Sequence, residues 1–197
     1  MIKPKLLIIA GPNGTGKTSL TDQILRHEWT EGCEYINPDI IARDRFGDWN
    51  SSDAVLKAAQ WATDLREKYL LEKRNFIFET VLSATDKIFF IERAKQQGYF
   101  IRLFFIGTDS PTINASRIAC RVIAGGHDVP IPKVISRYHK SILNCSKVVA
   151  SVDRLYVYDN SVDNMLPKLL FRATEGKIVR QYVATNEWAK QIKNCCL

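Results

Sequence analysis

The segment Gly11–Thr18 constrains this chain more than any other stretch, because it fits the pattern G-x-x-x-x-G-K-[ST] at every fixed position. A short, nearly all-apolar run (Lys5–Ala10) precedes the segment, and a pattern that predicts a helix (Lys17–Arg26) follows it. When a strand, a glycine-rich loop and a helix occur in this order, the loop amides and the positive end of the helix point at one anion. The segment therefore predicts a phosphate-binding loop that holds a nucleotide.

The residue types of this loop indicate how it would hold ATP and Mg²⁺, which we expect as cofactors. Lys17 is long enough to reach the β- and γ-phosphates, and Thr18 offers a hydroxyl to the metal ion. The glycines allow the backbone to pass close to the phosphate oxygens. The residues expected to bind the nucleotide are Gly11, Pro12, Asn13, Gly14, Thr15, Gly16, Lys17, Thr18 and Ser19.

Strand and helix patterns alternate along most of the chain. Further strands are predicted over Glu34–Asn37, Asn75–Glu79, Tyr99–Ile106 and Arg154–Tyr158. Helices are predicted after Pro38, over Asp53–Arg74 and Thr85–Gln97, after Ser110, and after Pro130 or Pro132. In the last of these helices the expected apolar stripe is Ile135, Tyr138, Ile142, Cys145 and Val149. This alternation predicts an α/β fold, a P-loop NTPase with a mostly parallel five-stranded sheet flanked by helices, as in nucleotide kinases.

The C-terminal part of the chain carries a different pattern. The segments Lys168–Ala173 and Ile178–Val183 flank Glu175-Gly176 and predict an antiparallel hairpin. A terminal helix is predicted over Glu187–Lys193. Because no long linker interrupts the chain, we expect one P-loop domain over residues 1–197, with a core at about 5–161 and the hairpin and helix at about 168–194.

Composition narrows the class of protein without identifying its ligand. The chain has 197 residues and a formal net charge of +7, which suits an anionic partner. Its longest apolar runs are too short to cross a bilayer, so we expect a cytoplasmic protein. The five cysteines are in no metal-ligand spacing, and we expect reduced thiols. A small chain with a phosphate-binding loop near its start, without the N/T-K-x-D signature of GTPases, favours a small-molecule kinase.

Two carboxylates follow predicted strands, at the edge of a parallel sheet where ligands bind. Asp39 comes just after the second strand, a place suited to taking a proton from an acceptor hydroxyl. The alternative is that Asp39 is a favourable charge at a helix N-terminus. Glu79 ends an otherwise apolar strand, where it would bind substrate hydroxyls or reach the Mg²⁺ shell through water.

Three arginines flank a glycine-containing turn. Arg117 and Arg121 lie four residues apart on one predicted helix, and Arg137 lies on the polar side of the next helix. The turn between them, Gly125–Pro130, begins with two glycines that can absorb backbone changes. This arrangement is typical of a kinase lid that brings positive charge to the transferred phosphoryl group. The alternative is that the arginines lie on solvated helix faces.

Several motifs occur together in a specific order. In chain order they are Gly11–Thr18, Asn37-Pro38-Asp39, Phe78-Glu79-Thr80-Val81-Leu82-Ser83, Gly125-Gly126-His127-Asp128-Val129-Pro130 and Tyr158-Asp159-Asn160-Ser161. The set resembles the zeta-toxin family of P-loop kinases, and more narrowly its short bacterial branch, which is often labelled a predicted ABC-type ATPase. The resemblance covers residues 5–161, most of the chain.

The resemblance implies a fold like that of adenylate and shikimate kinases, and ATP-dependent phosphorylation of UDP-N-acetylglucosamine at a sugar hydroxyl. It also implies an antitoxin protein as a partner. The expected catalytic residues are Lys17 on the phosphates, Asp39 as the base, and Arg121 and Arg137 on the transferred phosphoryl group. The residues expected to bind the acceptor are Asn37, Asp39, Glu79, Thr80 and Ser83.

The sequence departs from the better-known toxins after the third strand. Those toxins read Glu-Gly-Thr-x-Arg there, whereas this chain has Ser83 in place of the arginine, so the acceptor stays open between a sugar nucleotide and another small molecule. Two other functions also stay open, a polynucleotide 5′-hydroxyl kinase and an ATP-dependent switch without transfer. The scattered lysines and arginines argue against nucleic acid, and Asp39 beside a lid argues against the switch.

Overall fold

The computed structural model describes residues 3–47, 51–124 and 129–196. The strands are β1 (Lys5–Ala10), β2 (Glu34–Ile36), β3 (Phe76–Thr80), β4 (Phe100–Gly107), β5 (Arg154–Asp159), β6 (Lys168–Thr174) and β7 (Lys177–Gln181). The helices are α1 (Lys17–Ile24), α2 (Pro38–Phe46), α3 (Ser52–Leu71), α4 (Asp86–Gln96), α5 (Pro111–Ile123), α6 (Ile131–Val148) and α7 (Glu187–Lys193), and two 3-10 turns are η1 (Glu28–Thr30) and η2 (Val149–Ser151).

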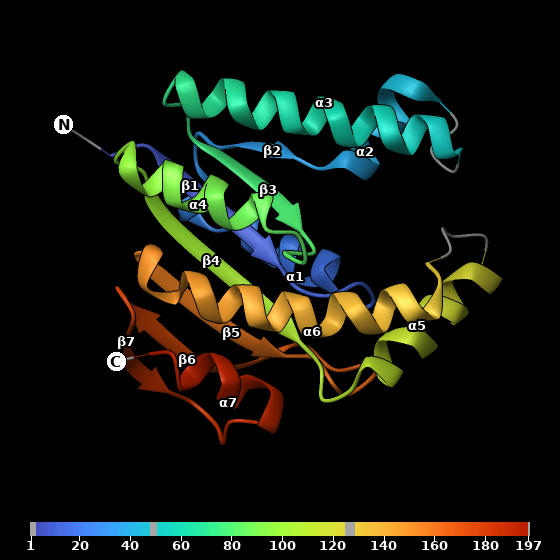
Figure 1. Cartoon of the computed structure of the whole chain (residues 1–197), viewed down its shortest axis with the longest axis vertical. Helices are drawn as coiled ribbons and strands as arrows, with labels where there is room; N and C mark the ends of the chain where they lie inside the picture. Colours follow the sequence, from blue (N-terminus) through green and yellow to red (C-terminus); the bar gives the residue numbers. More distant parts are fainter. Residues whose placement is uncertain (1–2, 48–50, 125–128, 197) are drawn as a thin grey trace.

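Within the described residues, the strands form one sheet in the order β2-β3-β1-β4-β5-β6-β7. The strands from β1 to β5 pair in parallel, and the hairpin of β6 and β7 continues the same sheet antiparallel beyond β5. The predicted α/β fold, with a mostly parallel sheet and a C-terminal hairpin, is thereby confirmed. Figure 1 shows the hairpin on the side of the sheet away from β2.

The central place of β1 explains its apolar sequence. Leu6–Ala10 are fully buried, because β3 and β4 pair with the two edges of β1 and helices cover both faces. A parallel strand that is buried on both faces has a nearly continuous apolar sequence. In Figure 1, α4, α6 and α7 lie over one face of the sheet, and α1 lies on the other.

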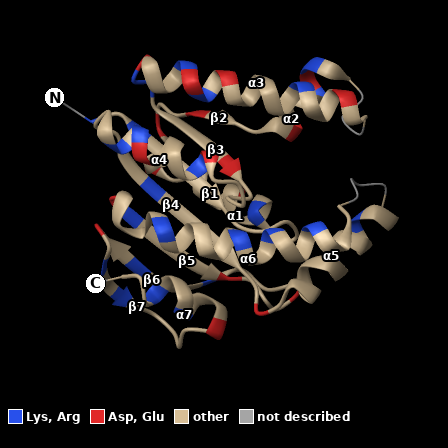
Figure 2. Cartoon of the chain, in the orientation of Figure 1, with Lys and Arg blue, Asp and Glu red and all other residues tan. Residues whose placement is uncertain are grey.

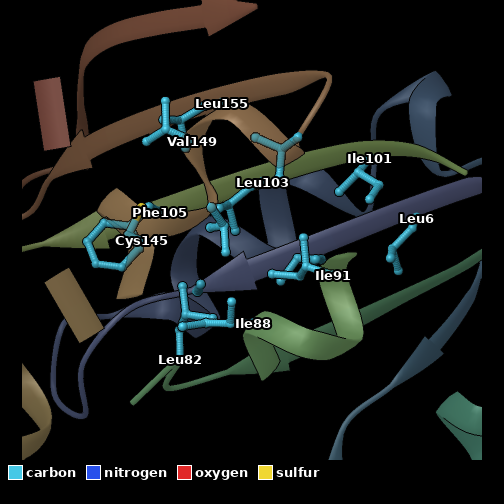
Figure 3. Close-up of a cluster of buried hydrophobic side chains, with 14 of the residues drawn as sticks. Leu6, Leu82, Ile88, Ile91, Ile101, Leu103, Phe105, Cys145, Val149 and Leu155 are labelled. Atoms are coloured by element: carbon cyan, nitrogen blue, oxygen red, sulfur yellow. The ribbon is translucent and has the colours of Figure 1, made fainter. Parts of the chain in front are cut away.

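Side chains that alternate along β1 enter two separate cores. Leu6 and Ile8 pack with side chains of α3, α4, α6 and α7, and Figure 3 shows part of this larger core around Leu103. Leu7 and Ile9 belong to a smaller core on the α1 face. The sheet is therefore held from both sides, which fixes the positions from which its loops leave.

Polar side chains cap the first turns of three helices. The side chains of Asn37, Ser51 and Ser110 each accept a hydrogen bond from the first turn of α2, α3 and α5. The predicted stripe of α6 is wrong at one position, since Ile135 is exposed and Val134 is buried instead. Ile135 and Val134 lie three and four residues before Tyr138, and both spacings fit one face of a helix. In α6 the buried residue is the one four positions before Tyr138.

No helix in the described ranges is long and apolar enough to span a membrane.

The parallel strands end together at one edge of the sheet. Ala10 at the end of β1 is paired with Thr80 of β3 and with Phe105 of β4. The loops that follow these strands therefore lie side by side. In open α/β sheets this carboxyl edge is where ligands bind.

Candidate active site

The loop between β1 and α1 has a backbone conformation that favours glycine. Gly11, Gly14 and Gly16 have φ angles of 154°, 78° and 79°. A Cβ atom at Gly11 would lie 2.2 Å from the carbonyl oxygen of Ile106, and one at Gly16 would lie 2.5 Å from the side-chain amide nitrogen of Asn160. Gly11 thus packs too closely against the end of β4 for a larger residue, and the positive φ angle of Gly16 also disfavours one.

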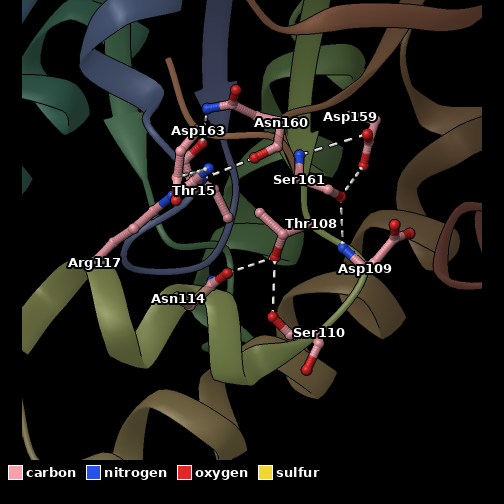
Figure 4. Close-up of polar contacts among 10 residues, drawn as sticks. All are labelled: Thr15, Thr108, Asp109, Ser110, Asn114, Arg117, Asp159, Asn160, Ser161 and Asp163. Carbon is pink, nitrogen blue, oxygen red and sulfur yellow. Dashed lines mark hydrogen bonds and ion pairs between the residues drawn. The ribbon is translucent and has the colours of Figure 1, made fainter. Parts of the chain in front are cut away.

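Amide side chains from two neighbouring segments hold this loop in place. Asn114 of α5 donates a 2.7 Å hydrogen bond to the carbonyl oxygen of Asn13. Asn160 after β5 donates a 2.8 Å bond to the carbonyl oxygen of Thr15, and Figure 4 draws both of these residues. Arg117 donates a 2.8 Å bond to the carbonyl oxygen of Asn160. Arg117 therefore supports the loop after β5 and is not among the residues that line the pocket beside the phosphate-binding loop.

A pocket of about 480 Å³ opens at this edge of the sheet. Its walls come from the phosphate-binding loop, the start of α2, one face of α3, the loop after β3, and helices α5 and α6. The lining includes all the residues predicted to be catalytic or to bind the acceptor, namely Lys17, Asn37, Asp39, Glu79, Thr80, Ser83, Arg121 and Arg137. Residues from distant parts of the sequence thus share one cavity, while their individual roles stay predictions.

Lys17 lies half-buried at the phosphate end of this pocket. Its Nζ donates hydrogen bonds of 2.9 and 3.0 Å to the carbonyl oxygens of Gly11 and Pro12. Burial lowers the pKa of Lys17 to about 8, because the ammonium loses much of its hydration. A cation that has lost its water in this way interacts strongly with an anion that binds next to it.

Charges from four other pocket residues also act on Lys17. Burial is the largest effect and lowers the pKa of Lys17. The carboxylates of Glu79 and Asp39 raise this pKa, and the guanidinium groups of Arg121 and Arg137 lower it further. The predicted catalytic residues are therefore close enough to the lysine to interact with it electrostatically.

Glu79 is held in place by two hydroxyl groups. Thr21 of α1 and Tyr35 of β2 donate hydrogen bonds of 2.6 and 2.5 Å to its Oε1 atom. Asn37 donates a 2.8 Å bond to the hydroxyl of Tyr35. Burial and the neighbouring carboxylate raise the pKa of Tyr35, which keeps the phenol protonated as a donor. This chain of bonds orients the carboxylate of Glu79 along one wall of the pocket.

Asp39 lies exposed in the first turn of α2. Its backbone amide donates a 2.8 Å hydrogen bond to Oδ1 of Asn37, which caps the helix. Asp39 lines the pocket while it also lies at the helix N-terminus, so its position fits both of the interpretations drawn from the sequence.

The two predicted lid arginines approach the pocket from α5 and α6. Arg121 is exposed in the last turn of α5, whereas Arg137 is half-buried and donates a 3.1 Å hydrogen bond to Oδ1 of Asn13. Burial lowers the pKa of Arg137. Residues 125–128 of the predicted lid turn Gly125–Pro130, which include His127, lie outside the described residues.

The rest of the predicted nucleotide site divides into open and buried positions. Asn13, Gly14, Gly16 and Thr18 line the pocket, Gly11, Pro12 and Thr15 are buried behind them, and Ser19 is exposed on α1. The left-handed glycines, the buried ammonium of Lys17 and the hydroxyl of Thr18 are the groups that a nucleotide with Mg²⁺ requires. The chemistry of this wall therefore fits both expected cofactors.

Sequence patterns do not single out several residues of this site, and Arg66 is the clearest case. Thr63 and Arg66 of α3 and Lys87 of α4 line the pocket. Arg66 shares the buried face of α3 with Ala62 and Tyr69. A charged residue within an apolar stripe is a signal that could have identified it.

Comparison with known proteins assigns the chain to a family. The sequence profile of the Zeta toxin family matches residues 1–166. The chain belongs to the Zeta toxin family. It is also 28% identical over 144 residues to an uncharacterized protein of Haemophilus influenzae, an alignment that covers 70% of this chain and 95% of the relative. The resemblance inferred from the ordered motifs is thereby confirmed.

Solved structures share the fold of this Zeta toxin family member. A structure from the PezAT chromosomal toxin–antitoxin system of Streptococcus pneumoniae has a TM-score of 0.63 at 16% identity, and the match covers 99% of this chain and 79% of that one. A chain of the Pnkp1/Rnl/Hen1 RNA repair complex has a TM-score of 0.55 at 19% identity, with 75% and 47% covered. These matches support the α/β kinase-like architecture.

Replacing Lys17 with methionine should change how stability depends on pH. The pKa of Lys17 falls from 10.5 to about 8 on folding, so the unfolded state binds more protons between these values and the wild-type free energy of unfolding rises across that window. Lys17→Met lacks this rise. Urea unfolding at several pH values measures the free energy of unfolding of Lys17→Met and of the wild type. The value for Lys17→Met minus the value for the wild type should become more negative between pH 7 and pH 10.

The matched control is Lys57→Met, which removes an exposed lysine of α3. Its difference from the wild type should stay nearly constant over the same range of pH. A difference that is equally constant for Lys17→Met would show that the ammonium of Lys17 is well hydrated and contradict the electrostatic description of the site.

Proposed function

We propose that this chain is an ATP-dependent phosphotransferase, built as one kinase domain over residues 1–197, that moves the γ-phosphoryl group to a hydroxyl of a small acceptor. One observation carries the proposal. A single pocket contains the lysine of a phosphate-binding loop, two carboxylates and two arginines, which are Lys17, Asp39, Glu79, Arg121 and Arg137. Membership in the Zeta toxin family supports the same reaction.

In the proposed reaction, each wall of the pocket has one task. The loop amides and Lys17 bind the phosphates of ATP, and Thr18 would contribute to binding Mg²⁺, which when bound neutralises phosphate charge. Asp39 takes the proton of the acceptor hydroxyl as its oxygen attacks the γ-phosphorus, and the bond to the leaving ADP oxygen breaks. Glu79 accepts a hydrogen bond from an acceptor hydroxyl and so positions the acceptor.

The arginines act on the charge that develops during transfer. Arg137 already contacts the phosphate-binding loop through Asn13, and Arg121 lines the same pocket from α5. Guanidinium groups placed beside the transferred phosphoryl group stabilise its equatorial oxygens more strongly in a pocket without bulk water than in solution. We therefore assign both arginines to stabilisation of the transition state.

UDP-N-acetylglucosamine, a sugar nucleotide, is the first acceptor to test, because the family resemblance implies it. A polynucleotide 5′-hydroxyl is a weaker candidate, since Figure 2 shows lysines and arginines spread over many helices and strands, without one dense run. The name of the PezAT system refers to a toxin and an antitoxin. We propose by analogy that an antitoxin protein binds this chain in the cytoplasm.

The test is incubation of the chain with ATP, Mg²⁺ and a panel of sugar nucleotides, aminoglycosides, small hydroxylated metabolites and 5′-hydroxyl oligonucleotides, with product masses measured directly. We expect one small acceptor to gain a single phosphoryl group. Phosphorylation of the oligonucleotide alone would favour the polynucleotide kinase. ATP hydrolysis without any phosphorylated product would favour the ATP-dependent switch.

Asp39→Asn should lower the rate of phosphoryl transfer by about 10²-fold or more, because the amide cannot accept the hydroxyl proton. ATP affinity should stay nearly unchanged, and calorimetry with a non-hydrolysable ATP analogue measures it separately. Asp44→Asn is the matched control on the exposed part of the same helix. If Asp39→Asn transfers phosphate as fast as this control, Asp39 is only a helix-start charge.

Arg121→Ala and Arg137→Ala should each lower kcat by about 10²-fold, because each removes a donor to the developing phosphoryl charge. Nucleotide affinity should change much less. Steady-state kinetics beside separate binding measurements will distinguish the two effects. Arg180→Ala, which removes an exposed arginine of β7, is the control. Unchanged kcat in both pocket variants would make these arginines surface charges without a part in transfer.

A further inference from the structure

A second basic site lies in the same pocket, away from Lys17. Thr63 and Arg66 line the pocket from α3, and Lys87 lines it from the first turn of α4. Lys17, Arg121 and Arg137 line the pocket from α1, α5 and α6 instead. The pocket therefore contains two separate groups of positive charge, one at the phosphate-binding loop and one between α3 and α4.

Arg66 is buried without an ion pair among the described contacts. The side chain is only 5% exposed, and its guanidinium lies 5.2 Å from the ring centre of Phe78. Its one hydrogen bond among those contacts is a 2.8 Å bond from Nη2 to Oγ1 of Thr63. A guanidinium has five N–H donors, so most of its donor capacity stays available on the pocket side.

The neighbouring carboxylates are engaged elsewhere. Glu67 forms its ion pair with Arg93, and Asp86 forms one with Lys87, and both carboxylates are more than a third exposed. They raise the pKa of Arg66, whereas burial, the larger effect, lowers it. A buried cation that lacks a close anion costs free energy of folding unless another interaction offsets the lost hydration.

The opposite wall adds a second feature that favours an anion. Ser83 and Ala84 line the pocket just before α4, a helix of eleven residues that begins at Asp86. The residue before it, Thr85, makes no side-chain hydrogen bond to cap the helix. The positive end of α4 therefore lies beside this part of the pocket, on the same side as Lys87.

This wall is built to hold its shape. Leu82 is buried and has a φ angle of 57°, which is unusual for a residue other than glycine. Ser141 and Asn144 of α6 donate hydrogen bonds of 2.6 and 3.0 Å to the carbonyl oxygens of Val81 and Leu82. A loop fixed in this way can present a preorganised site to a ligand.

We propose that Arg66, with Lys87 and the N-terminal end of α4, binds an anionic group of the acceptor, a phosphate, a diphosphate or a carboxylate. The proposal rests on the kinase function proposed above, because ATP occupies the phosphate-binding loop and leaves this second group of charges to the acceptor. Arg66 is then a specificity residue, which selects acceptors that carry a negative charge as well as a hydroxyl.

The test compares neutral acceptors with related acceptors that carry one anionic group. The pairs are uridine with uridine 5′-diphosphate for a diphosphate, glucose with glucose 6-phosphate for a phosphate, and glucose with glucuronate for a carboxylate. We expect one anionic member to have the higher kcat/KM, and the pair that responds identifies the group. Neutral members that are as good as their anionic partners in all three pairs would overturn the proposal.

Arg66→Gln removes the charge and retains a hydrogen-bond donor. It should lower kcat/KM for the anionic acceptor by about ten- to a hundredfold, the usual effect of losing a charged hydrogen bond, and leave the neutral member unchanged. Arg66→Lys should retain part of the preference. Lys57→Gln, which removes an exposed charge from the same helix, is the matched control. An equal loss for both members of a pair would mean that Arg66 is only structural.

A binding measurement separates this proposal from the kinase function. Inorganic diphosphate is titrated by calorimetry into the chain saturated with a non-hydrolysable ATP analogue and Mg²⁺. The wild type should bind it, and Arg66→Gln and Lys87→Gln should bind it at least tenfold more weakly. If no acceptor is phosphorylated but this pattern holds, the anion site stands and the kinase reaction fails. If transfer occurs and diphosphate binding is the same in all variants, the anion site fails.

Thermal unfolding of each variant accompanies these measurements. Lys87 lies partly exposed at the pocket wall, so Lys87→Gln should fold even if Arg66→Gln does not. In that case the diphosphate affinities of Lys87→Gln and Arg66→Lys are compared with that of the wild type. Diphosphate binding that both variants leave unchanged would overturn the proposal.

Discussion

The parallel pairing of β1 with β3 is the interaction on which the candidate site depends. Ala10 pairs with Thr80, and the amide of Gly11 donates a 3.3 Å hydrogen bond to the carbonyl oxygen of Thr80. The phosphate-binding loop therefore starts beside Glu79, and the backbone sets the spacing between the nucleotide and this carboxylate. A slip of one residue in this register would turn Glu79 to the other face of the sheet. Side chains of α1 and β2 then refine its orientation.

The balance of charge in the pocket explains what it can bind. Five cationic side chains and two carboxylates line it, namely Lys17, Arg66, Lys87, Arg121 and Arg137 with Asp39 and Glu79. The cations are distributed over several walls, so they repel one another less than a single cluster would and can face more than one anion. The carboxylates line the same pocket as the phosphate-binding loop. This distribution agrees with the transfer proposed above, in which the pocket holds two ligands.

The sequence predicted the fold well and the site in part, for physical reasons. The motif Gly11–Thr18, the alternation of patterns and even the bounds of α7 follow from local periodicity and turn chemistry, which one chain segment contains by itself. Ile135 was misplaced because two helical spacings fit equally and only packing chooses between them. The contacts of Glu79 with Tyr35, and the place of Arg66, depend on which strands and helices become neighbours. No local pattern records that information.

The C-terminal segment contributes to the same site although the family match ends at residue 166. The indole of Trp188 in α7 donates a 3.3 Å hydrogen bond to Oδ1 of Asp159, and its ring packs so closely on Gly107 that a Cβ there would lie 2.4 Å away. Asp159 also accepts a 2.6 Å bond from the hydroxyl of Ser161, within the turn whose Asn160 holds the phosphate-binding loop. Helix α7 therefore forms part of the support of the phosphate-binding loop, because it contacts the turn from which that loop is held.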